Sequence, residues 1–197
     1  MKKITAQALL KTYLYVMSLI TLTVALFSGA FLIQAGSSYI APLNFSYSLY
    51  PANMMTEVKK IEEYEIEECN LDDEVVMVED NKYCWNENTR REGIINGMTI
   101  FISMVLLFLL HQMGIKKTKK LETPEWLIKG YTFISLMIYS VTGVVAIPSA
   151  IYQTVNYLFT KVGQYSTQYA PAYSIGLILL TLPLWYIFFK KTLELKD

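Results

Sequence analysis

The chain has 197 residues, of which 53% are hydrophobic and 17% are charged. This apolar fraction excludes a disordered or collagen-like chain. Its 17 Lys and Arg are balanced by 17 Asp and Glu, so it lacks the basic excess that is typical of nucleic-acid-binding proteins. We therefore predict no nucleic-acid partner.

Long stretches without Lys, Arg, Asp or Glu indicate where the chain crosses a membrane. A helix needs about 20 apolar residues to cross roughly 30 Å of hydrocarbon, and a charge at the bilayer centre opposes insertion by about 2.5–3.5 kcal/mol. Four stretches are long enough: 12–56, 93–115, 130–160 and 162–189. We predict one all-α membrane domain over 1–197, with an acidic extracytoplasmic loop at 35–92 and transmembrane helices at 12–34, 93–115, 130–155 and 172–190.

The first of these helices has an alternative interpretation as a secretory signal peptide. Lys2 and Lys3 form a basic start, and Ser28-Gly29-Ala30 resembles a cleavage site. The apolar run continues through Phe31-Leu32-Ile33, which exceeds the usual apolar region of about 7–15 residues in a signal peptide. We therefore favour a membrane anchor.

Basic residues in the short flanking segments predict the orientation. The N-terminal flank, the connection between the second and third helices, and the C-terminal tail together carry 11 basic and 4 acidic residues, a net charge of +7, which leaves −7 for the rest. The positive-inside rule then places both termini in the cytoplasm and the long loop outside it.

Several residues indicate where helices begin or bend. Thr89-Arg90-Arg91-Glu92 has the spacing of a capping box, and Thr123-Pro124 and Ala170-Pro171 each place a proline at a helix start. Pro148 and Pro183 lie inside apolar spans, where a missing N–H predicts a helix kink. Such kinks serve packing geometry or, alternatively, a gating hinge.

The extracytoplasmic loop carries a dense acidic segment and both cysteines. Eight acidic residues lie within 62–74, without the spacing and central glycine of an EF-hand, so a solvated acidic face is favoured over a calcium site. Cys69 and Cys84 are separated by 14 residues, and in an oxidising compartment such a pair predicts one structural disulfide. Between them, Val75-Val76-Met77-Val78 predicts a short strand.

The predicted spans contain few residues that could catalyse a reaction or bind a metal or cofactor. No ionisable acidic or basic residue lies deep in any span, which argues against a proton-coupled transporter. His111 is the sole histidine, next to Gln112, and together they form the one candidate polar site; a single histidine supplies neither paired haem ligands nor a zinc site. We predict no catalytic residues, no metal and no cofactor.

The first and third helices resemble each other, which indicates an internal repeat. A displacement of 118 positions aligns Lys11 with Lys129 and Tyr13 with Tyr131, and a displacement of 77 aligns Leu107-Phe108 with Leu184-Trp185. Each unit contains two crossings, so the repeat is a parallel pair of hairpins about an axis along the membrane normal.

The helix endings carry a resemblance to a known family. Leu107-Phe108-Leu109-Leu110-His111 has an apolar-aromatic-x-x-His pattern, and the segment from Pro183 to Phe188 follows it with Phe188 in place of histidine. The chain resembles uncharacterised bacterial four-helix integral membrane proteins, a domain-of-unknown-function family built of two tandem transmembrane hairpins. This resemblance implies a fold and a bacterial inner membrane, and no activity.

We expect a non-enzymatic integral membrane protein that acts as a scaffold or as an accessory or assembly subunit. Its expected partners are the lipid bilayer, further subunits in a homo-oligomer or membrane complex, and an extracytoplasmic protein bound through the acidic loop. The main alternative is an oligomeric channel with a conduit lined by the Ser, Thr and Gln side chains of the spans. A lipid-active enzyme using His111 and the cytoplasmic lysines is a third interpretation.

Overall fold

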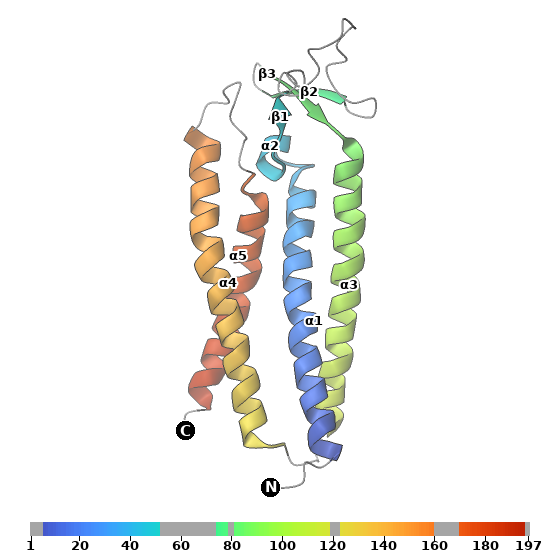
Figure 1. Cartoon of the computed structure of the whole chain (residues 1–197), viewed down its shortest axis with the longest axis vertical. Coiled ribbons are helices and arrows are strands. Elements are labelled where there is room, and N and C mark those ends of the chain that lie inside the picture. Colours follow the sequence, from blue (N-terminus) through green and yellow to red (C-terminus); the bar gives the residue numbers. More distant parts are fainter. Residues whose placement is uncertain (1–5, 52–73, 79–80, 119–122, 160–169, 196–197) are drawn as a thin grey trace, which may run out of the picture.

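Four long helices form the body of the molecule (Figure 1). The computed structural model describes residues 6–51, 74–78, 81–118, 123–159 and 170–195. Each of the four helices is long and apolar enough to cross a membrane, as in a multi-pass membrane protein. They are α1 (Ala6–Ser37), α3 (Glu87–Lys117), α4 (Glu125–Phe159) and α5 (Ala172–Glu194). The four predicted crossings are therefore confirmed as helices, and the start of α1 and the end of α5 lie at the same end of the bundle (Figure 1).

The helices extend beyond the predicted spans, because a helix does not have to end where its apolar part ends. α3 begins at Glu87, and the side chain of Asn86 caps it by accepting a hydrogen bond from the backbone N–H of Asn88 at 2.9 Å. The capping box predicted at Thr89 to Glu92 is wrong, since these residues already lie within the helix. By contrast, α4 begins immediately after Thr123-Pro124, as predicted.

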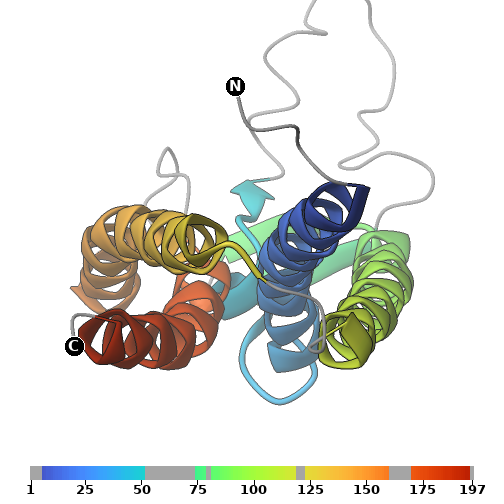
Figure 2. The ribbon, with the colours of Figure 1, turned by 90° about the horizontal axis from the view of Figure 1, so that it is seen from below.

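α1 occupies the centre of the bundle (Figure 2). It packs along α3 on one side and along α5 on the other, while α4 packs mainly along α5. The bundle therefore consists of one pair, α1 with α3, and a second pair, α4 with α5, that meet through α1 and α5.

Two glycines allow close helix approach in this arrangement. A Cβ on Gly97 would lie 3.2 Å from Leu32 Cγ, and a Cβ on Gly176 would lie 3.0 Å from Ile33 Cβ and 3.3 Å from the carbonyl oxygen of Ala30. Small residues at helix contacts let backbones approach and gain van der Waals packing, which drives association in lipid. Gly97 thus fits α3 against α1, and Gly176 fits α5 against α1.

The buried core lies between α1, α4 and α5. Aromatic rings dominate it: Phe188 lies 5.5 Å from Tyr139 and 5.8 Å from Tyr131, centroid to centroid. Leu26 of α1 and Leu177 of α5 are buried in the same cluster. Contacts between aromatic rings add about 0.5–1.5 kcal/mol beyond area burial, so this cluster joins the second pair of helices to α1.

A small cap covers the end of the bundle opposite the termini (Figure 1). We use the name cap for α2 (Leu43–Ser46) and a three-stranded antiparallel sheet in the order β1-β3-β2, formed by β1 (Tyr50–Pro51), β2 (Glu74–Val78) and β3 (Asn81–Trp85). The predicted strand at 75–78 is confirmed within β2, and the sheet is a small addition to a chain that is mainly helical, as predicted. Most of the acidic segment lies outside the described residues.

The cap has its own hydrophobic core. Leu49, Tyr83 and Trp85 are buried in it, and Leu43 and Val76 pack against them. β3 is the central strand: Cys84 pairs with Tyr50 of β1 and with Val75 of β2. The sheet therefore connects the chain that follows α1 to the chain that enters α3.

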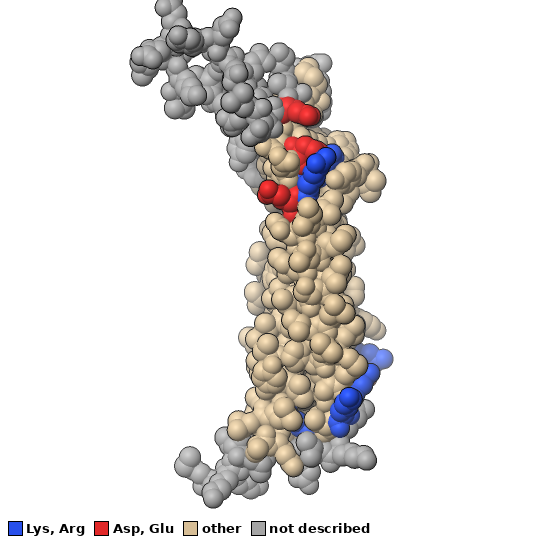
Figure 3. Space-filling model, turned by 90° about the vertical axis from the view of Figure 1, so that its right-hand side faces the viewer, with Lys and Arg blue, Asp and Glu red and all other residues tan. Residues whose placement is uncertain are grey.

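Charged side chains lie at the two ends of the molecule. Viewed from the side of α3, a broad band without Lys, Arg, Asp or Glu separates acidic and basic residues near the cap from lysines at the other end (Figure 3). This separation follows from the charge-free stretches of the sequence, each of which is long enough for a helix to cross the hydrocarbon.

Candidate functional site

The predicted polar site at His111 and Gln112 lies in the contact between α1 and α3. Gln112 Nε2 donates a hydrogen bond to Ser18 Oγ at 2.7 Å. His111 Nδ1 donates to the carbonyl oxygen of Leu107 at 2.6 Å, and its ring centroid lies 5.9 Å from that of Tyr13. Each side chain thus has a partner within the two-helix contact.

The ring contact of His111 has a counterpart in the second pair of helices. The two displacements found in the sequence relate Tyr13 to Tyr131 and His111 to Phe188. Tyr131 and Phe188 have centroids 5.8 Å apart at an interplanar angle of 67°, close to the 5.9 Å and 57° of Tyr13 and His111. The residues that these displacements match therefore make similar ring contacts.

Pro148 and Pro183 lie within helices that continue past them. Pro148 lies inside α4 and Pro183 inside α5, and both side chains are exposed on the outer surface of the bundle. Each proline withholds one N–H from its helix. Whether either helix is kinked stays a prediction.

Several other polar side chains in the spans join helices or bond to their own backbone. Ser174 Oγ donates to Gln153 Oε1 at 2.8 Å, and Trp185 Nε1 donates to Ser140 Oγ at 3.0 Å, both between α5 and α4. Within single helices, a hydroxyl donates to a carbonyl oxygen three or four residues earlier at Thr21, Ser28, Ser135, Thr142 and Ser149. These side chains serve packing and satisfy the hydrogen bonding that a membrane demands.

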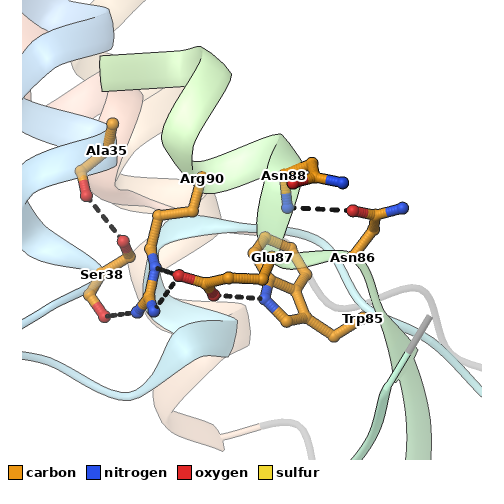
Figure 4. Close-up of polar contacts among 7 residues, drawn as sticks. All are labelled: Ala35, Ser38, Trp85, Asn86, Glu87, Asn88 and Arg90. Atoms are coloured by element: carbon orange, nitrogen blue, oxygen red, sulfur yellow. Dashed lines mark hydrogen bonds and ion pairs between the residues drawn. The ribbon is translucent and has the colours of Figure 1, made fainter. Parts of the chain in front are cut away.

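The most elaborate polar cluster joins the cap to the bundle (Figure 4). Arg90 of α3 donates from Nε to Glu87 Oε1 at 2.9 Å, and its NH2 group forms an ion pair with the same oxygen. Its NH1 lies 3.5 Å from the carbonyl oxygen of Ser38, just after α1, and its guanidinium lies 4.1 Å from the ring centroid of Tyr39. Arg90 therefore holds the end of α1 against the start of α3.

The same cluster extends into the sheet. Trp85, the last residue of β3, donates from Nε1 to Glu87 Oε2 at 3.3 Å (Figure 4). Glu87 thus accepts from both the strand and the helix. We call the four residues Ser38, Trp85, Glu87 and Arg90 the clasp, because they connect α1, β3 and α3.

A second set of hydrogen bonds holds α2 to the end of α1. Gln34 Nε2 donates to the carbonyl oxygen of Ser46 at 2.7 Å, and the hydroxyls of Ser37 and Ser46 lie 2.7 Å apart. Tyr47 follows, with its ring centroid 4.9 Å from that of Trp85. Burial raises the pKa of Tyr47, against the opposing effect of the Arg90 guanidinium, so Tyr47 stays a neutral donor at physiological pH.

The predicted disulfide lies only partly within the described residues. Cys84 lies on the central strand β3, whereas Cys69 lies outside the described residues. The bridge therefore remains a prediction.

Sequence reasoning placed Arg90 at a helix start but missed its partners. Ser38 and Arg90 are 52 positions apart, so no local spacing connects them. A usable signal was the sequence Trp85-Asn86-Glu87, which offers a donor, a helix cap and a carboxylate one turn before Arg90.

In the described ranges, no group of three or more His, Cys, Asp or Glu side chains lies close enough to hold a metal ion. Comparison of the chain with protein-family models, with curated proteins and with solved structures found no match. The arrangement of the site therefore carries the functional argument by itself.

Proposed function

We propose that this protein is a non-enzymatic membrane scaffold or accessory subunit that presents its cap to a protein partner. The observation that carries this proposal is the clasp, which ties a small folded surface to two membrane helices through Arg90 and Glu87. A surface fixed in this way has little conformational freedom left to lose on binding, and such preorganisation favours association.

We propose that the cap is extracytoplasmic and that both termini are cytoplasmic. Eleven basic residues in the terminal and connecting segments support this orientation under the positive-inside rule. Because the chain resembles bacterial inner-membrane proteins, we propose the bacterial inner membrane as its location. The acidic segment of the loop would then also be extracytoplasmic and would add negative charge for a partner to recognise.

We propose a Cys69–Cys84 disulfide that constrains the loop on the central strand of the cap. An oxidising extracytoplasmic compartment and the presence of two cysteines in the whole chain support it. Closing such a loop stabilises the folded state by about 3 kcal/mol in the chain-entropy model. Intact mass measured with and without reduction tests it: we expect the unreduced chain to be lighter by two hydrogens, and two free thiols would contradict it.

We propose that the two helix pairs are tandem copies of one hairpin. The matched contacts of Tyr13 with His111 and of Tyr131 with Phe188 support this interpretation, as does the packing of α1 with α3 and of α4 with α5. Tandem hairpins also accord with the family resemblance, which stays a prediction.

The channel alternative receives less support. Several of its candidate lining residues instead join one helix to the next, as in the pairs of Gln112 with Ser18 and of Ser174 with Gln153. A conduit would have to form between subunits.

Site-specific photocrosslinking in native membranes tests the scaffold proposal. A photoreactive residue at Met77, which is 59% exposed on β2, should yield an adduct with a second protein, and Arg90→Gln should weaken that adduct because it loosens the cap. The matched control is Val144, which is 72% exposed on α4 and lies in the apolar part of the helix. No adduct at Met77, or equal adducts at both positions, would contradict a partner bound at the cap.

A further inference from the structure

α3 is the least covered of the four long helices. Only 6% of the most apolar 18-residue stretch of α3 is buried, whereas 39% of the corresponding stretch of α1 is buried. α1 is its main contact within the described chain, and Gly97 and Phe101 face α1. The opposite face of α3 therefore lies on the outside of the bundle, on the side shown in Figure 3.

That exposed face carries a heptad pattern. All six of its side chains are exposed: Asn96, Thr99, Ser103, Leu106, Leu110 and Met113. They alternate three and four positions apart, which is the a/d spacing of a helix that packs against another helix at a shallow angle. We call these six residues the α3 stripe.

The first half of the α3 stripe is polar within the hydrocarbon. Arg91 and Lys116 are 25 positions apart, or about 38 Å along a helix, so Ser103 lies near the middle and Asn96 about 10 Å nearer the cap. Asn and hydroxyl side chains in lipid seek hydrogen bonds across helix contacts. The next residues of this face, Glu92 and Lys117, lie near the two ends of the helix.

These polar groups are not hydrogen-bonded within the described part of the chain. Hydroxyls elsewhere in the spans, such as Thr142 and Ser149, donate to their own helix backbone. No hydrogen bond of Asn96, Thr99 or Ser103 is found among the described residues. Lipid chains offer them neither donor nor acceptor. Within the described part of the chain, this face of α3 therefore carries polar groups whose hydrogen-bonding capacity is not used.

We propose that the α3 stripe is the contact with a second copy of this chain, in a parallel two-fold dimer. Two copies inserted in the same orientation place identical residues at identical depth, so Asn96 meets Asn96 of the other copy. A side-chain amide both donates and accepts, hence this pair is self-complementary, as an isologous contact requires. An Asn at one such heptad position specifies register in parallel helix dimers.

The second half of the α3 stripe supplies the packing for this dimer. Leu106, Leu110 and Met113 are 57%, 58% and 50% exposed. In a parallel pair they would interlock below the polar residues, nearer the termini. This dimer leaves α1, α4, α5 and the cap as they are, so it goes beyond the scaffold function and does not rest on it.

Cysteine crosslinking in native membranes tests the geometry of the contact while Asn96, on which the register of the dimer depends, stays in place. Ser103→Cys should form an oxidised dimer, whereas Met104→Cys, at the same depth but half-buried on the next position, should not. Unmodified chain gives the background from Cys69 and Cys84. Equal crosslinking at 103 and 104, none at 103, or a 103 adduct with a different protein would overturn the proposal.

Purified protein in liposomes, measured by single-molecule photobleaching over a range of protein-to-lipid ratios, tests the role of Asn96. Asn96→Ala should raise the dimer dissociation constant about 5- to 30-fold, which corresponds to the 1–2 kcal/mol that model peptides give for such bonds. Asn96→Gln keeps a side-chain amide and should restore much of the lost dimer affinity. The control Asn88→Ala removes the same side chain from α3 where water competes, and should change nothing. A protein that stays monomeric at every density, or equal effects of the two alanine variants, would overturn the proposal while leaving the cap experiment intact.

Discussion

Replacing Arg90 with Gln should loosen the cap while leaving the membrane helices in place. The change removes the ion pair with Glu87, the bond to the Ser38 carbonyl and the contact with the Tyr39 ring. A half-exposed pair of this spacing contributes about 0.3–0.5 kcal/mol, a cation–π contact about 0.5–1 kcal/mol, and the long bond to Ser38 little more. The total is about 1–2 kcal/mol.

Hydrogen exchange measured by mass spectrometry detects this loss of stability separately in each segment of the chain. If the cap opens as a unit, 1–2 kcal/mol corresponds to roughly 5- to 30-fold faster exchange of amides in β3 and α2, with little change in the buried part of α1. The exchange rate of Arg90→Lys should lie between those of the wild type and of Arg90→Gln, because an ammonium keeps the charge but loses the bidentate geometry of the guanidinium.

The control is Arg91→Gln, which removes an exposed arginine from the next position of α3. It should leave exchange in the cap unchanged. If Arg91→Gln and Arg90→Gln accelerate exchange equally, the cap is held by general charge at the helix start and the clasp is the wrong explanation. If Arg90→Gln has no effect, the sheet core around Trp85 holds the cap alone.

Three further substitutions test helix packing. Gly176→Val should separate α5 from α1, because even a Cβ would lie 3.0 Å from Ile33. Overpacking of this kind costs about 1–3 kcal/mol. A thermal melt in detergent that matches the wild type would contradict this prediction. His111→Phe should be tolerated in the same melt, since the equivalent ring contact in the second hairpin uses phenylalanine. Phe188→His should destabilise by roughly 1–3 kcal/mol, because it buries a polar ring where Phe188 is 6% exposed, and equal effects of the two exchanges would contradict the matched environments.

The four long apolar helices could be predicted from the sequence because the cost of a charge in hydrocarbon leaves long stretches without charged residues. Helix ends could not, because Glu87 and Asn88 lie on a part of the helix that suits water, where hydropathy gives no signal. Asn86 caps α3 seven positions before its apolar part begins. Hydropathy locates the part of a helix that suits a membrane rather than the whole helix, so each helix is longer than the span predicted within it.

The cap was harder to predict for a different reason. β2 has enough Val and Met to indicate a strand, but β1 and β3 are short and mixed in composition, and their pairing joins Tyr50 to Cys84 across 34 positions. The clasp likewise depends on the meeting of Ser38 and Arg90, which only the packing of α1 against α3 brings about. At His111 the sequence identified a position of interest, and the structure adds that it lies beside Tyr13 as part of the packing between helices.

The central place of α1 has a consequence for how the chain is made. Helices enter the membrane in the order of synthesis, and α1 precedes every helix that packs against it. When α3 emerges, its main contact is already in the bilayer, so the first hairpin and its cap can assemble while the second is still being translated. α4 then has few contacts to make until α5 follows, because α5 is the helix along which it packs. The two helices of the second hairpin should therefore join the first hairpin together, in one late step.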